Sequence, residues 1–157
     1  MNEPRLYTVE EAQKTLPFVK RVVEDIVQAF ERRSQMAMDL QRLGGAKAGT
    51  ASEDRAFALE NSMHACEAEI LRYQQELDDL GIELKDYRIG LIDFFSRYKD
   101  RIVYLCWKLD DGPALSHWHE LDAGFRGRQA LTPKNREQFL GRMRCEPGTS
   151  AARPGAK

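Results

Sequence analysis

Residues 16–43 read LPFVKRVVEDIVQAFERRSQMAMDLQRL, and this stretch decides the fold. Its apolar residues recur three and four positions apart, which places their side chains on one face of an α-helix. A second apolar row runs beside the first, so the face is wide enough to pack against two neighbours. The first row is Leu16, Val19, Val23, Ile26, Phe30, Ala37 and Leu40, interrupted by Arg33, and the second is Val22, Ala29, Met36 and Leu43.

The ends of this helix are marked in the sequence. Thr8 and Glu11 have the spacing of a capping box, which predicts a helix beginning directly after Thr8. Pro17 lacks a backbone amide, so we expect a short first turn followed by a kink or a restart. Gly44 and Gly45 end the helical pattern.

The following residues repeat the helical spacing. Ser52 is a suitable N-cap, and Gly81 is a suitable C-terminal glycine for a second helix. Its apolar positions are Leu59, Met63, Cys66, Ile70, Tyr73, Leu77 and Leu80. Because the two helices have similar lengths and a short connection, they are predicted to form an antiparallel helical hairpin over about residues 8–81.

After Gly81 the period of the apolar residues changes to two, which is typical of β-strands. The alternating stretches are residues 82–84, 89–95, 101–109 and 115–121. Turn sequences at residues 98–100 and 110–113 separate them, which predicts an antiparallel meander of three or four strands. The predicted fold class is therefore α+β, with a long antiparallel helical hairpin packed on a small antiparallel β-meander.

The chain length favours one domain, residues 1–144. Within it, the sheet and a polar motif occupy about residues 82–131, and Thr132–Pro133 predicts a short helix over residues 133–143 with Phe139 and Leu140 as apolar contacts. Residues 145–157 are rich in Pro, Gly, Ser and Ala, so we expect disorder there. The sheet has apolar residues on both faces, and only one can face the hairpin. A second copy covering the other face predicts a homodimer.

Composition excludes several classes of protein. Positive and negative residues balance, with Lys+Arg 24 against Asp+Glu 25, which argues against nucleic-acid binding and against docking on anionic membranes. No apolar stretch has the length of a membrane span, and the first residues do not read as a signal peptide. Three separated cysteines without a CxxC pair favour reduced thiols. We therefore expect a cytoplasmic protein.

The segment SHWHELDAGFRGRQ, residues 116–129, concentrates the polar side chains that could perform chemistry. His117 and His119 are two positions apart, so a strand would present both rings on one face, as a metal site requires. Asp93 or Glu11 could add a carboxylate, a ligand set suited to zinc, iron or manganese. Alternatively, both histidines are hydrogen-bonded groups that orient a turn.

The second half of this segment, from Gly124 to Arg128, is a candidate anion cradle. Glycines allow close approach of backbone amides, and arginines bind carboxylates or phosphates with two parallel hydrogen bonds. The alternative is that Arg128 pairs internally with Asp122 or Asp93 and fixes the segment.

Cys106 lies within an apolar strand, and His119 could lie across the sheet from it. A catalytic thiol needs an electropositive, partly exposed environment, so a buried and inert cysteine is the favoured interpretation.

Four stretches together resemble a bacterial family known as domain of unknown function 2203. They are residues 6–12 (LYTVEEA), 90–94 (GLIDF), 105–107 (LCW) and 118–128 (WHELDAGFRGR). The resemblance covers about Leu6 to Leu131 and implies no established activity. It singles out the positions Asp93, Trp107, His119, Asp122, Gly124, Gly127 and Arg128, whereas the position of His117 is often another aromatic residue in that family.

We consider three functions. The first is a cytoplasmic binding or regulatory protein with a polar His/Asp/Arg site for a small anionic ligand or a partner. Its site would consist of Asp93, Trp107, Trp118, His119, Asp122, Gly124, Gly127 and Arg128. The second is a metalloprotein with hydrolase or oxidoreductase activity, in which His117 and His119 bind a divalent metal and Glu120 or Asp122 is the general base. The third is a structural adaptor whose polar segment only stabilises the fold.

Overall fold

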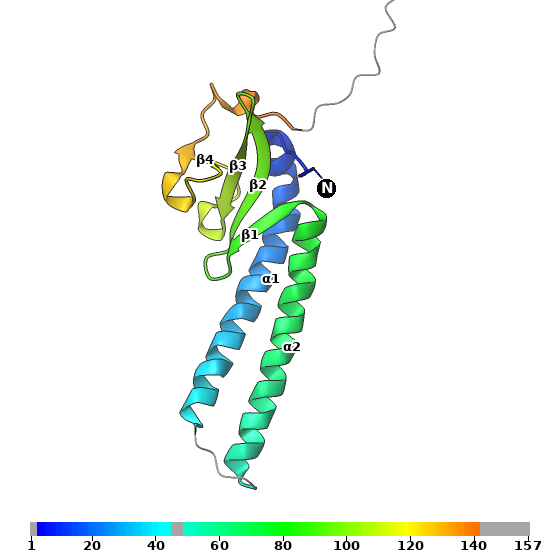
Figure 1. Ribbon diagram of the computed structural model, residues 1–157, viewed down its shortest axis with the longest axis vertical. Coiled ribbons are helices and arrows are strands. Elements are labelled where there is room, and N and C mark those ends of the chain that lie inside the picture. Colours follow the sequence, from blue (N-terminus) through cyan, green and yellow to red (C-terminus); the bar gives the residue numbers. More distant parts are fainter. Residues whose placement is uncertain (1–2, 45–48, 142–157) are drawn as a thin grey trace, which may run out of the picture.

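The computed structural model describes residues 3–44 and 49–141, and these begin with two long antiparallel helices (Figure 1). They are α1 (Val9–Arg42) and α2 (Ala51–Asp79). The predicted hairpin is therefore confirmed. The predicted capping box is also present: the Glu11 amide donates to the Thr8 hydroxyl at 3.0 Å, and the Thr8 amide donates to the Glu11 carboxylate at 3.2 Å.

Two details of the hairpin differ from prediction. The helix α1 continues through Pro17, so the expected restart is absent. Proline removes only one hydrogen bond there, and the adjacent Leu16 and Val19 are packed in the core. The N-cap of α2 is Thr50 and not Ser52, because the Thr50 hydroxyl accepts a hydrogen bond from the Glu53 amide.

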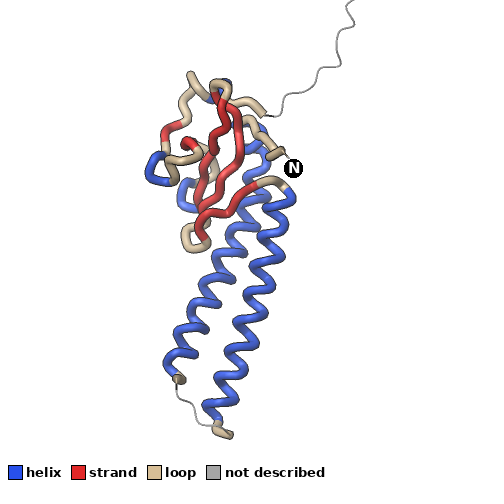
Figure 2. Tube along the Cα trace, viewed as in Figure 1, coloured by secondary structure: helices blue, strands red, loops and turns tan. Residues whose placement is uncertain are grey.

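Five antiparallel strands follow α2, hydrogen-bonded in their order along the chain (Figure 2). They are β1 (Ile82–Asp86), β2 (Leu91–Tyr98), β3 (Arg101–Lys108), β4 (His117–Glu120) and β5 (Gln129–Ala130). The first four form the predicted meander, and β5 adds a two-residue pairing to β4. The α+β class is confirmed.

The inner face of the sheet packs against the hairpin and forms the hydrophobic core. Directly paired residues of neighbouring antiparallel strands share a face. Phe94, Leu105 and Trp118 are paired in this way across β2, β3 and β4, and all three are buried with residues of α1. The core therefore lies between the inner face and the upper half of the hairpin.

The lower half of the hairpin projects beyond the sheet (Figure 1). Within the described residues, the buried side chains of α1 end at Ala29, and those of α2 begin at Cys66. Neither helix contains an apolar stretch long enough to cross a membrane, and the described residues form no other helix of comparable length.

The segment after β5 differs from the predicted helix over residues 133–143. Its described part contains only a 3-10 turn, η3 (Arg136–Gln138), followed by extended chain. Leu140 exchanges two backbone hydrogen bonds with Arg97 of β2, at 3.0 and 2.8 Å, and Phe139 stacks on Tyr98 with ring centroids 4.7 Å apart. Pairing with the end of β2 that extends beyond β1 satisfies this backbone, so no helix is needed. The rest of that prediction and the predicted tail lie outside the described residues.

Candidate metal centre

Register in the sheet brings an acid, a thiol and an imidazole together on its outer face. Asp93 of β2 is paired with Cys106 of β3, and Cys106 is paired with His117 of β4. His119 lies two residues further along β4, opposite Tyr104. Because paired residues share a face, all these side chains lie on the side of the sheet away from the hairpin.

His119 makes the central contact of this site with Asp93. Its Nε2 is 3.1 Å from both carboxylate oxygens of Asp93, and its Nδ1 is 2.8 Å from the backbone carbonyl of Glu120. A carbonyl can only accept, so Nδ1 carries a proton and donates it.

Cys106 completes the group, because it is paired with Asp93 across β2 and β3. One ligand atom from each of Asp93, Cys106 and His119 lies within 4.8 Å of the other two. The three residues are 2%, 0% and 3% exposed. We name these three residues the outer-face cluster.

Burial shifts the titration of this cluster. It raises the pKa of Asp93 above its ordinary value, although His119 and the Cys106 thiol act in the opposite direction. Burial, together with the adjacent Asp93 carboxyl, raises the pKa of the Cys106 thiol strongly. The thiol therefore stays protonated at neutral pH, as expected for an inert buried cysteine, unless a cation replaces its proton.

The centre of the outer face is covered by the chain itself. Tyr104 is 8% exposed, and its ring contacts those of His119 and Phe95 at centroid distances of 5.3 and 4.9 Å. The Lys85 ammonium lies 4.8 Å from the Tyr104 ring centroid. The burial of this face therefore does not require a second chain.

Arg128 pairs internally, but its partner is neither Asp122 nor Asp93. The guanidinium forms an ion pair with Asp111, the last residue of the 3-10 turn η1 (Leu109–Asp111), and also lies 3.5 Å from the Cys106 carbonyl. Both side chains are about nine-tenths buried. Burial would raise the pKa of Asp111, but hydrogen bonds from Arg128 and the Lys108 amide hold it below its ordinary value.

The two glycines of the predicted anion cradle allow the chain to form the tight turn around η2 (Phe125–Gly127). Gly124 has φ +62, a left-handed conformation that favours glycine. A Cβ on Gly127 would lie 2.4 Å from the Cβ of Ala123, so no side chain fits there. With Arg128 engaged by Asp111, the segment has the features of a tight turn and not those of an open anion site.

The other predicted site residues are not brought into the outer-face cluster. Trp107 is in the core, where its indole donates to the Gly112 carbonyl at 2.9 Å, and Trp118 is also in the core. Asp122 is exposed. His117 is near the cluster but outside it. Its Nδ1 is 2.8 Å from the Ser116 hydroxyl, and burial and the charge of Arg128 lower its pKa.

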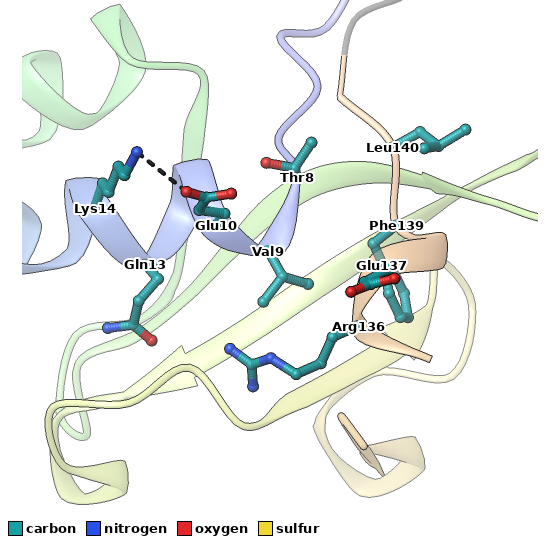
Figure 3. A pocket seen from close by; sticks show the side chains of 9 residues that line it. All are labelled: Thr8, Val9, Glu10, Gln13, Lys14, Arg136, Glu137, Phe139 and Leu140. Atoms are coloured by element: carbon teal, nitrogen blue, oxygen red, sulfur yellow. Dashed lines mark ion pairs between the residues drawn. The ribbon is translucent and has the colours of Figure 1, made fainter. Parts of the chain in front are cut away.

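A separate cleft of about 630 Å³ lies between the first turns of α1 and the segment around η3 (Figure 3). Val9 and Phe139 provide apolar lining, and Lys14 pairs with Glu10 at 3.2 Å across its exposed rim. None of the outer-face cluster lines this cleft. The chemically reactive groups and this cleft are therefore different parts of the molecule.

Comparison with known proteins places the chain in a family. The sequence model of the family described as "Uncharacterized conserved protein (DUF2203)" matches residues 5–131, and the chain belongs to this family. That range contains α1, α2 and all five strands, and therefore the whole outer-face cluster. No curated protein and no solved structure matches the chain.

Proposed function

We propose that this protein is a metal-dependent binding protein whose ion, best suited to be Zn²⁺, is held by Asp93, Cys106 and His119. The observation that carries this proposal is the convergence of three ligand atoms within 4.8 Å of one another at a buried position. Cysteine, histidine and carboxylate are the ligands that zinc takes in proteins. The proposal retains the histidine and aspartate of the predicted site and replaces His117 with Cys106.

The surroundings of His119 support this assignment. Histidine ligands usually donate their second ring N–H to a carbonyl or carboxylate, which fixes the tautomer and leaves the other nitrogen for the metal. His119 Nδ1 donates to the Glu120 carbonyl in this way, and Nε2 faces Asp93. A divalent ion with two anionic ligands would also be electrically neutral, which reduces the cost of burying their charges.

Binding is favoured over hydrolysis by the state of the predicted general bases. Both carboxylate oxygens of Glu120 accept hydrogen bonds from the Arg101 Nε at 3.0 Å, so this carboxylate is occupied. Asp122 is exposed in the turn and is not part of the cluster. A general base must reach the proton that it removes, and neither residue meets this requirement beside the three ligands.

The test is metal analysis of untagged protein purified without chelator and incubated with Zn²⁺. We expect one ion per chain, and strong loss of binding in Asp93→Asn, Cys106→Ser and His119→Ala. His117→Ala and Cys66→Ser are matched controls, because they remove the same ligand types outside the cluster, and both should retain the ion. Circular dichroism checks folding, and the nearly isosteric Asp93→Asn and Cys106→Ser keep the test usable if His119→Ala unfolds.

Substitution with Co²⁺ provides an independent measurement. A thiolate–cobalt charge-transfer band should appear in the wild type and vanish in Cys106→Ser. A wild type that binds neither ion, or one whose binding is unchanged in Cys106→Ser, would falsify the proposal. Bound Zn²⁺ should also stabilise the fold, by about 2.7 kcal/mol at a free concentration one hundred times the Kd.

A further inference from the structure

The part of the hairpin that the sheet does not cover carries a groove, and this groove is separate from the proposed metal centre. Two hollows, of about 260 and 430 Å³, lie next to each other because Phe30 of α1 lines both. Leu71 of α2 lines the first hollow and Met38 of α1 lines the second. We name this surface the hairpin groove. It lies next to the turn between β1 and β2, because Tyr87 stacks on Phe30 at 5.6 Å.

The apolar side chains of this groove are exposed to an unusual degree. Leu71 is 66% exposed and Met38 is 51% exposed. Phe57, also 66% exposed, lies fourteen residues before Leu71 and therefore on the same side of α2. None of the three belongs to the buried seam of the hairpin, which in α2 consists of Cys66, Ile70 and Leu77. Phe57 lines neither hollow, but exposed apolar side chains of this size, such as Leu71 and Met38 beside Phe30, are typical of contact surfaces.

The charges around the groove balance each other. Arg33 and Glu67 form an ion pair at its edge, with the Arg33 Nε 2.9 Å from the Glu67 carboxylate. Glu31 and Arg88 line the second hollow, and neither side chain has a hydrogen bond or ion pair with another described residue. The rim therefore offers one unpaired anion and one unpaired cation, which a surface of the same composition can satisfy.

From these observations we infer that the hairpin groove binds the same groove of a second copy of this chain. In a two-fold symmetric contact the same patch faces itself, so a residue that contacts another across the interface is contacted by it in return. Such symmetry pairs Glu31 of each copy with Arg88 of the other and buries Leu71, Met38 and Phe57 of both. A balanced rim does not suit nucleic acid or an anionic membrane, which require an excess of positive charge.

The experiment is size-exclusion chromatography with light scattering on the full chain at micromolar concentration. The wild type should have twice the 18.0 kDa mass of one chain. Leu71→Glu combined with Met38→Glu should give a monomer, and Leu71→Glu alone should raise the dissociation constant by at least roughly thirtyfold. Phe18→Glu is the matched control, because Phe18 is 51% exposed outside the groove and its replacement should leave the dimer intact.

Charge reversal tests the pairing across the interface. Glu31→Arg and Arg88→Glu should each weaken the dimer, and the double variant should restore it, since the two charges exchange places. A monomeric wild type, or a dimer that persists in Leu71→Glu with Met38→Glu, overturns the inference. Metal content should be the same in dimer and monomer, so the outcome is independent of the proposed metal centre.

Discussion

Two buried acid–base pairs lie close to each other in this domain, Asp93 with His119 and Asp111 with Arg128. Each joins a carboxyl group to a nitrogen base, and each has little exposure to water. In the first pair, burial raises the pKa of Asp93, and an imidazole and a thiol share its surroundings. In the second, hydrogen bonds and the permanent charge of Arg128 lower the pKa of Asp111.

The difference indicates which pair can perform chemistry. A guanidinium does not lose its proton in proteins, so the pair of Arg128 and Asp111 has one state near neutral pH and acts as a fixed link between the turn segment and η1. The Cys106 thiol, by contrast, holds a proton that a metal ion can displace, and Asp93 and His119 offer their ligand atoms within 4.8 Å of it. Polar composition alone does not distinguish a site from a structural link. A site is distinguished from a structural link by groups that can change their protonation state.

The largest effect that separates the two pairs is expected from Arg128→Met. This change leaves the Asp111 carboxylate buried without its partner, which should lower the free energy of unfolding by about 3–5 kcal/mol. Urea unfolding measures the loss, and zinc binding by the folded fraction should persist. Arg126→Met is the control, because Arg126 is an exposed arginine of the same segment. A loss below about 1 kcal/mol would contradict the structural role given to Arg128.

A medium effect, and a pH dependence of defined sign, is expected from Asp111→Asn. Its carboxylate accepts charge-assisted hydrogen bonds, so the variant should lose about 1.5–3 kcal/mol at neutral pH. Because the pKa of Asp111 is lower in the folded state, its contribution is complete above the unfolded pKa of about 3.9 and disappears as the pH falls through the folded pKa. Stability of wild type and variant should therefore converge in acid. Thermal unfolding between neutral and strongly acidic pH measures this, and a constant difference would refute the assignment.

The sequence predicts the scaffold of the outer-face cluster better than the members of that cluster. The helical spacing defines the hairpin, and the turn at residues 98–100 fixes the register of β2 and β3. Counting outward from Lys99 and Asp100 pairs Asp93 with Cys106, as the structure has it. This count could have placed Cys106 beside Asp93, but its apolar neighbours favoured an inert core cysteine.

Other features could not be derived from spacing along the chain. Asp111 belongs to a turn sequence, and its contact with Arg128 depends on how the segment after β4 folds back toward η1. The extended course of Phe139 and Leu140 depends on the last residues of β2, which β1 does not cover and which pair with this backbone. Both are long-range effects, in which tertiary contacts override local preference.

The smallest effect is expected from Asp122→Ala, a change at a position that matches the family motif. Asp122 is exposed, and it forms no hydrogen bond or ion pair with another described residue. Its removal should change the free energy of unfolding by no more than about 0.5 kcal/mol and leave zinc binding unaltered. Urea unfolding and metal analysis should be carried out on this variant and on Asp93→Asn. The two variants compare the exposed carboxylate of the turn with the buried carboxylate of the cluster. Loss of metal in Asp122→Ala would mean that the turn supplies a ligand, and the assignment of three ligands would have to be extended to it.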